Sequence, residues 1–169
     1  TAGDDITLNS GLAATGTIAL NTAGATGDAL VINATGIDFA ASTVGGALTA
    51  TATTGNIADT GIVTVGGASS FTTTLANADI LLDATPAFTG PVSLSVNGAT
   101  GNAEISNATI ALDLGTVTTT LGGTLIIETN AGSITDTGVV TASGTSSFTT
   151  TTAGDDITLN SGLAATGTI

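Results

Sequence analysis

The chain contains no lysine, arginine or histidine, whereas 13 of its 169 residues are acidic, so its formal net charge is −13 at pH 7. Each carboxylate must therefore be solvated, accept hydrogen bonds from N–H or O–H groups, or be neutralised by an external cation. Nucleic acid is not expected as a partner, because neutralising phosphates requires Lys or Arg. Catalytic triads that need a His or Lys base are also impossible, so we do not expect an enzyme.

Cysteine, methionine, tryptophan and tyrosine are absent as well. The chain therefore offers no disulfide, few targets for oxidation and no cleavage site for trypsin-like proteases. We interpret these absences as typical of a secreted protein at the cell surface or outside the cell; compositional drift in a low-complexity array is the alternative. No run of 18 apolar residues occurs, so no membrane insertion is expected.

The residue types that are abundant favour strands. Hydrophobic residues make up 41% of the chain and aromatic residues only 2%, so the apolar material is mainly Ile, Leu, Val and Ala. Thr, Val and Ile are restricted at χ1 and fit pleated strands. With 24 Gly and only 2 Pro, turns rely on Gly, Asn, Asp and Ser. No stretch places strong helix formers at helical spacing, so an all-β fold without helix is predicted.

A long internal repeat is the strongest signal in the sequence. Residues 1–18 read TAGDDITLNSGLAATGTI, and residues 152–169 repeat them without a change. We therefore interpret residues 1–151 as one full repeat unit and residues 152–169 as the start of the next. Self-similarity at a fixed period predicts a solenoid, so the whole chain is expected to be one continuous solenoid. We expect the sequence to be an excerpt of a longer array whose targeting signals lie elsewhere.

The 151-residue unit is itself a diverged duplicate. Residues 56–74 return at 133–151, 77 positions later, and residues 24–27 return at 98–101, 74 positions later. The unit therefore consists of two sub-repeats, of about 77 residues and about 74 residues, each long enough for several turns of a solenoid. The difference in length between them falls near residues 110–121.

Short alternating runs bounded by turn residues predict the strands. Examples are 5–9, 17–21, 29–33, 62–65, 79–82, 92–96 and 124–128. Strands this short cannot bury a core alone, whereas stacked turns cover one another, so we predict a parallel β-helix. Three turns of about 25 residues or four of about 19 would fill each sub-repeat, and the sequence leaves both open.

Several segments resemble the repeats of large secreted adhesins. They are Gly45-Gly46-x-Leu48-Thr49, the Ile-x-Asp-Thr-Gly segments at 57–61 and 134–138, and the Phe-Thr-Thr-Thr runs at 71–74 and 148–151. The similarity is to filamentous haemagglutinin and other two-partner secretion exoproteins. It implies a right-handed parallel β-helix shaft, with secretion and adhesion determinants often in other regions.

Calcium is the one ligand for which candidate residues can be named. Asp4 and Asp5 return as Asp155 and Asp156, and the other sub-repeat keeps only Asp79. If Asp5, Asp79 and Asp156 lay at equivalent turns, stacked carboxylates and Asn carbonyls could hold Ca²⁺. The alternative is that each Asp caps its own turn, and it is the interpretation we prefer, so no metal, cofactor or catalytic residue is predicted outright.

Two further pairs of equivalent positions recur, and neither pair predicts a catalytic or binding site. Asp59 and Asp136 occupy the same place in the two sub-repeats, so they are expected to serve the coil. Asn33-Ala34-Thr35 and Asn107-Ala108-Thr109 match the N-glycosylation pattern, but an Asn stacked at a coil corner is the preferred role.

These observations predict a structural or adhesive segment of a long extracellular filament or cell-surface shaft. The open strand rows at the ends of a β-helix invite pairing, and the chain has no Lys and only Pro86 and Pro91 to block it, so end-to-end self-association is expected. The alternative is an adhesin module whose Thr and Asn faces bind glycans or a surface. Ice binding and a β-helical carbohydrate enzyme are more remote alternatives.

Overall fold

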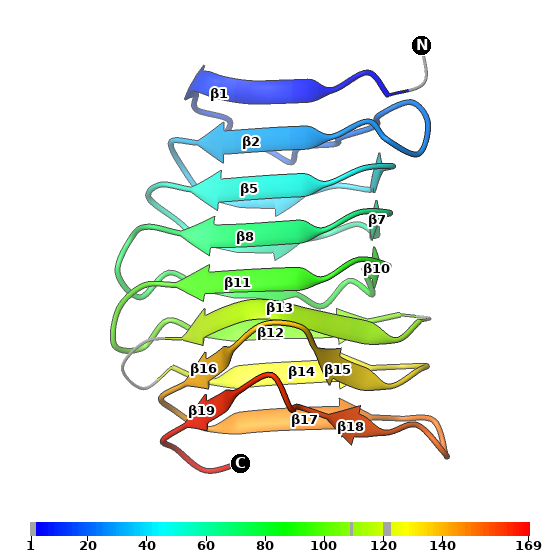
Figure 1. The fold of residues 1–169 in the computed structure, drawn as a ribbon. Helices are drawn as coiled ribbons and strands as arrows, with labels where there is room; N and C mark the ends of the chain where they lie inside the picture. The colour runs from blue at the N-terminus through cyan, green and yellow to red at the C-terminus, as the bar shows by residue number, and fades with distance from the viewer. Residues whose placement is uncertain (1–2, 109, 120–122) are drawn as a thin grey trace.

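The computed structural model is a rod of parallel strands stacked turn upon turn (Figure 1). It describes residues 3–108, 110–119 and 123–169, and these residues contain no helix. In Figure 1, the front strands run to the left and the chain returns behind them as it descends from β1 to the C-terminus, which is a right-handed coil. The predicted all-β parallel solenoid is confirmed.

Three sheets run along the rod. Sheet 1 consists of β1 (Ile6–Leu12), β2 (Ala29–Asn33), β5 (Leu48–Ala52), β8 (Ser69–Thr73), β11 (Val92–Val96), β13 (Leu112–Thr119), β15 (Ile134–Asp136), β16 (Val140–Ala142), β18 (Ile157–Thr158) and β19 (Leu163–Ala165). Sheet 2 consists of β3 (Ile37–Phe39), β6 (Ile57–Asp59), β9 (Ile80–Leu82), β12 (Ala103–Asn107), β14 (Leu125–Thr129) and β17 (Ser146–Thr150). Sheet 3 consists of β4 (Ser42–Val44), β7 (Val63–Val65) and β10 (Ala87–Phe88).

The length of a turn varies along the rod. Asp28 and Ala47 are hydrogen-bonded across successive turns and are 19 residues apart, whereas Asp79 and Asn102 are bonded in the same way and are 23 residues apart. Along sheet 1, the path from β1 to β18 takes seven steps, so each sub-repeat holds three and a half turns. This differs from both the three and the four turns that the sequence left open, because the corner loops absorb the variation in length.

Because each sub-repeat holds three and a half turns, equivalent segments of the two sub-repeats lie on opposite sides of the rod. From β2 to β11, sheet 1 carries unbroken five-residue strands, and the other side carries the short strand pairs β3/β4, β6/β7 and β9/β10. After β12 the arrangement reverses: sheet 2 carries unbroken strands, and sheet 1 carries the pairs β15/β16 and β18/β19. The exchange follows from two unbroken strands in succession, β11 and β12. One predicted strand, 17–21, forms only isolated bridges, between Ile18 and Phe39 and between Asn21 and Thr43.

The core is a column of inward side chains between the sheets. Strands alternate buried and outward positions, and the buried set is mostly Ile, Leu, Val and Ala. Phe71 lies at the centre, with its ring 6.3 Å from that of Phe39 and 5.6 Å from that of Phe88, both edge to face. Phe148, its counterpart in the other sub-repeat, lies on sheet 2 near the C-terminal end and is only half-buried.

Candidate functional site

Acidic and amide side chains form ladders at the corners before the strands. Asn56 Oδ1 accepts a hydrogen bond from Asp79 N at 2.9 Å, and Asp79 Oδ1 accepts one from Asn102 N at 2.8 Å. Asn102 Oδ1 in turn accepts from Thr124 N and Thr124 Oγ1. Each side chain thus binds the backbone of the following turn, so these residues hold successive turns in register.

A second ladder of the same kind precedes sheet 1. Asp5 Oδ1 accepts a hydrogen bond from Asp28 N at 2.9 Å, and Asp28 Oδ1 accepts one from Ala47 N at 2.7 Å. The expectation that each Asp caps its own turn is therefore wrong for Asp5 and Asp79, because the N–H groups that their side chains bind belong to the next turn. The position of Asp28, directly before the run 29–33 as Asp5 is before 6–9, was the signal available in the sequence.

The five calcium candidates do not form one cluster. Asp79 precedes a strand of sheet 2, whereas Asp5 and Asp156 precede strands of sheet 1, at the N- and C-terminal ends of the rod. Asp4 pairs with Ala23 in an isolated bridge, and Asp155 Oδ2 accepts a hydrogen bond from Gly132 N at 2.7 Å. In the described ranges no group of three or more acidic side chains comes together to surround a cation.

Asp59 and Asp136 end the first short strand of a split pair and fix the bend of the next turn. Asp59 Oδ1 accepts hydrogen bonds from Asp83 N at 2.9 Å and Ala84 N at 3.1 Å. Asp136 Oδ1 accepts the matching bonds from Asn160 N at 2.8 Å and Ser161 N at 3.1 Å. These two carboxylates therefore serve the coil, as expected from their recurrence.

The second carboxylate oxygen distinguishes the two corners. Asp136 Oδ2 also accepts from Ser161 N, at 3.1 Å, whereas Asp59 Oδ2 is buried without a hydrogen-bond partner. Burial raises the pKa of the Asp59 carboxyl above its usual value, and the hydrogen bonds from Ala84 N and Asp83 N only partly oppose this. The fold thus disfavours the ionised form of Asp59.

Asn33 and Asn107 are fully buried at corners, which confirms their predicted structural role. Asn33 Oδ1 accepts from Ala14 N at 2.9 Å, and its Nδ2 donates to Ala14 O and Gly36 O. Asn107 Oδ1 accepts from Phe88 N, and its Nδ2 donates to Ile110 O. Glycosylation at either side chain is incompatible with this burial; Thr109 of the second sequence match lies outside the described residues.

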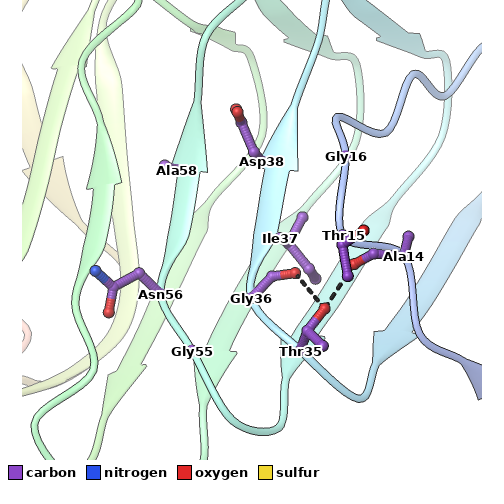
Figure 2. Close-up of a pocket in the computed structure, with 10 residues that line it drawn as sticks. All are labelled: Ala14, Thr15, Gly16, Thr35, Gly36, Ile37, Asp38, Gly55, Asn56 and Ala58. Atoms are coloured by element: carbon purple, nitrogen blue, oxygen red, sulfur yellow. Dashed lines mark hydrogen bonds between the residues drawn. The ribbon is translucent and has the colours of Figure 1, made fainter.

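A hollow of about 560 Å³ lies at the corner between sheets 1 and 2 (Figure 2). Its walls are Ala14, Thr15, Gly16, Thr35, Gly36, Ile37, Asp38, Gly55, Asn56 and Ala58. Thr35 Oγ1 donates to Ala14 O at 2.6 Å and closes the floor. The hollow offers hydroxyls, one amide and one carboxylate, which suit an uncharged polar ligand.

Close backbone contact explains the glycines in this hollow. A Cβ on Gly55 would lie 2.8 Å from Gly36 N and 2.9 Å from Gly36 Cα, so neither turn leaves space for a side chain. The hollow coincides with the short turns near the N-terminal end of the rod, where Ile37 pairs with Ile57. The hollow therefore lies where the corner loops are short.

Comparison with known proteins gives one match, to a family described as repeats of unknown function (DUF5649), over residues 26–95 and again over 100–168. The chain belongs to this family. The two matched copies begin 74 residues apart, which is one of the two offsets between the sub-repeats, and the break between them lies at the end of β11 and in the loop before β12. The first match spans the three steps of sheet 1 from β2 to β11.

Other comparisons add no relative. No curated protein and no solved structure matches the chain. Among the residues that the structure describes, no helix is long and apolar enough to cross a membrane.

Proposed function

We propose that this chain is a structural and adhesive segment of a long extracellular filament or cell-surface shaft, and that it extends by end-to-end stacking. The proposal is supported chiefly by the parallel ladder of sheet 1, in which seven steps from β1 to β18 return the repeated 18-residue segment to the same sheet, so that a further unit continues the same ladder.

The C-terminal face of the rod presents what a further turn would cover. A hollow of about 400 Å³ opens there, lined by Ser146, Ser147, Phe148, Ile157, Leu159, Leu163 and Ile169. The strands β17, β18 and β19 each pair with a strand on one side only, and except for Ser146 N, which donates to Thr168 O, the outer N–H and C=O groups of β17 face outward like those of β18 and β19 (Figure 1). Such an edge is a template for a further parallel strand.

The opposite face has the matching character. The strand β1 pairs only with β2, and all strands of the rod run parallel, so a second copy stacked on the C-terminal face continues the same ladder. A head-to-tail contact of this type does not close on itself, and repeated copies produce a filament. Further turns of the same repeat in one chain would cover the face in the same way.

Two observations support an extracellular location: the residue types that the chain lacks, and its resemblance to secreted proteins. The chain has no residue at which trypsin-like proteases cleave, and no Cys, Met, Trp or Tyr to oxidise. Its Gly45-Gly46-x-Leu48-Thr49 and Ile-x-Asp-Thr-Gly segments resemble those of filamentous haemagglutinin and related two-partner secretion exoproteins, which are secreted shafts. An adhesin module that binds glycans is the second candidate, and the polar corner beside Thr35 and Asn56 favours it.

Small-angle X-ray scattering of the 169-residue chain tests the filament. We expect particles that lengthen with concentration while the cross-section stays constant. Leu163→Glu places a charge on the terminal face and should abolish the lengthening, because the charge would be buried unpaired. Leu75→Glu is the control, since Leu75 is similarly exposed but lies on a loop at the side of the rod. A constant particle length for the unmodified chain at all concentrations would contradict the proposal.

A further inference from the structure

Hydroxyl side chains line the outer surface of sheet 1 in a regular column. Strand register aligns Thr51, Thr72, Ser95, Thr118 and Thr141, one from each of five successive turns. Neighbouring turns in such a stack are about 4.8 Å apart. The hydroxyls of Thr51, Thr72 and Ser95 have no hydrogen-bond partner within the described part of the chain. They are therefore free to bind something outside it.

A second column runs beside the first. Thr49, Ser70 and Ser93 are aligned by the same pairings and lie two positions earlier on their strands, about 7 Å away. Between the columns the side chains point inward and are buried, as at Ala50 and Phe71. The result is a rigid surface with a two-dimensional period.

This surface also carries little charge for so acidic a molecule. Among the outward positions of the described strands, sheet 2 carries Asp38, Glu104 and Glu128, whereas sheet 1 carries only Asp113, near the start of β13. The Asp113 carboxylate accepts a hydrogen bond from Thr137 Oγ1. Two molecules with a net charge of −13 each repel one another, and a side with little charge lets them approach more closely than sheet 2 does.

We propose that the outer surface of sheet 1, from β2 to β16, binds the same surface of a second copy of this chain, side by side. A partner with the same period of about 4.8 Å stays in register over any number of turns, and only another solenoid of this type has that period built in. The contact is isologous, with the two columns of one copy facing those of its partner. It joins rods laterally and does not require that their ends stack.

The area of the surface sets how tightly single units associate. The six turns from β2 to β16, with strands of about five residues, cover about 29 by about 17 Å, or about 490 Å². A stable interface needs about 800 Å² per partner, so one unit associates weakly. Because the repeat completes whole turns, the surface of sheet 1 continues in line from unit to unit, and several units in one rod bind jointly.

Disulfide trapping tests the proposal, because the chain has no cysteine of its own. Thr72→Cys places a thiol at the middle of the surface, and Thr64→Cys places one on the exposed, neutral outer side of sheet 3. Under mild oxidation we expect the Thr72→Cys chain to form covalent dimers at least about tenfold faster than the Thr64→Cys chain. Added salt should accelerate it further, because salt screens the repulsion between the acidic rods.

A second substitution separates surface contact from chance collision. Thr118→Glu in the Thr72→Cys chain introduces a charge two turns away on the same column, and dimer formation should fall to the rate of the Thr64→Cys chain. Equal rates of dimer formation for the Thr72→Cys and Thr64→Cys chains would overturn the proposal. Binding of a glycan or of ice by the hydroxyls would not change that conclusion. End-to-end stacking leaves this comparison unchanged, since neither position lies at an end of the rod.

Discussion

Asp59 and Asp136 hold the same corner of the repeat with the same hydrogen bonds, yet they lie on opposite sheets of the rod. The agreement extends to the backbone around them. Thr60 N and Gly61 N both donate to Phe39 O, and Thr137 N and Gly138 N both donate to Leu114 O. One local sequence therefore builds one local structure regardless of which side of the solenoid it occupies.

Asp59 is expected to make stability depend on pH. Its pKa is raised by burial in the folded state, so ionisation at neutral pH costs stability, and the fold gains stability as the pH falls through that raised pKa towards the unfolded value of about 3.9. Asp59→Asn should remove this gain, because Asn carries no charge. Urea unfolding monitored by circular dichroism at neutral pH and at a pH of about 4.5 measures the effect.

Asp136→Asn is the matched variant for that measurement. It removes one charge from an identical corner, but both oxygens of Asp136 accept hydrogen bonds, whereas one oxygen of Asp59 accepts none. The difference in pH dependence between the two variants isolates the orphaned Asp59 oxygen. The same pH dependence in Asp59→Asn as in the unmodified chain would refute the assignment.

Asn33→Ala should lower the free energy of unfolding by about 2–3 kcal/mol, because it leaves Ala14 N without its partner and removes one of the two donors to each of the carbonyls of Ala14 and Gly36. Asn97→Ala is the control, since exposed Asn97 makes a single side-chain bond, to Thr74 O. It should cost no more than about 0.5 kcal/mol. Equal losses for the two variants in denaturant titrations would show that Asn33 does not pin its corner.

Phe71→Ala should cost about 3–5 kcal/mol, because it opens a cavity between the rings of Phe39 and Phe88. Phe148→Ala removes the equivalent residue of the other sub-repeat, which is only half-buried, and should cost distinctly less. Chemical denaturation of both variants provides the comparison. A larger loss at Phe148 would mean that further molecules cover the terminal turn under the conditions of the measurement.

Gly55→Ala should destabilise the chain, since its methyl group would press against the backbone of Gly36 in the neighbouring turn. A cost of about 1–3 kcal/mol is typical of such overpacking. Gly16→Ala, in the same hollow, is the control because a Cβ there meets nothing within 4 Å. It should be neutral or slightly stabilising, by up to about 1 kcal/mol. Thermal unfolding of the two variants distinguishes a tight corner from a general need for glycine.

Much of the fold could be predicted because strand and turn chemistry is local. The runs 29–33 and 92–96 coincide with β2 and β11, and the inward alternation of each strand follows from its own residues. The number of turns in a sub-repeat could not be predicted, because it depends on corner loops whose lengths differ without a marker in composition. Because the number of turns was unknown, the sequence also did not reveal that Asp5 and Asp79 precede strands of different sheets.

The candidate surface was only half visible in the sequence. The sequence suggested faces of Thr and Asn side chains, but the alignment of these residues needs the register of each turn, which a one-residue slip would reverse. Thr51 pairs with Thr72 and Thr72 with Ser95, and these two steps differ in sequence separation, so no fixed spacing reveals the column. Only the assembled coil shows that the hydroxyls of Thr51, Thr72 and Ser95 have no hydrogen-bond partner in the described residues. It also shows that most outward carboxylates lie on another sheet.

The change of side between β11 and β12 constrains how such an array can vary in length. Loss of one sub-repeat by recombination would shift everything downstream by an odd number of half turns. All later uncharged surfaces would then point away from the earlier ones, and a neighbouring rod could bind only part of the molecule. Gain or loss of whole 151-residue units preserves the phase, so a lineage can lengthen or shorten the rod in these steps without disrupting its lateral contacts.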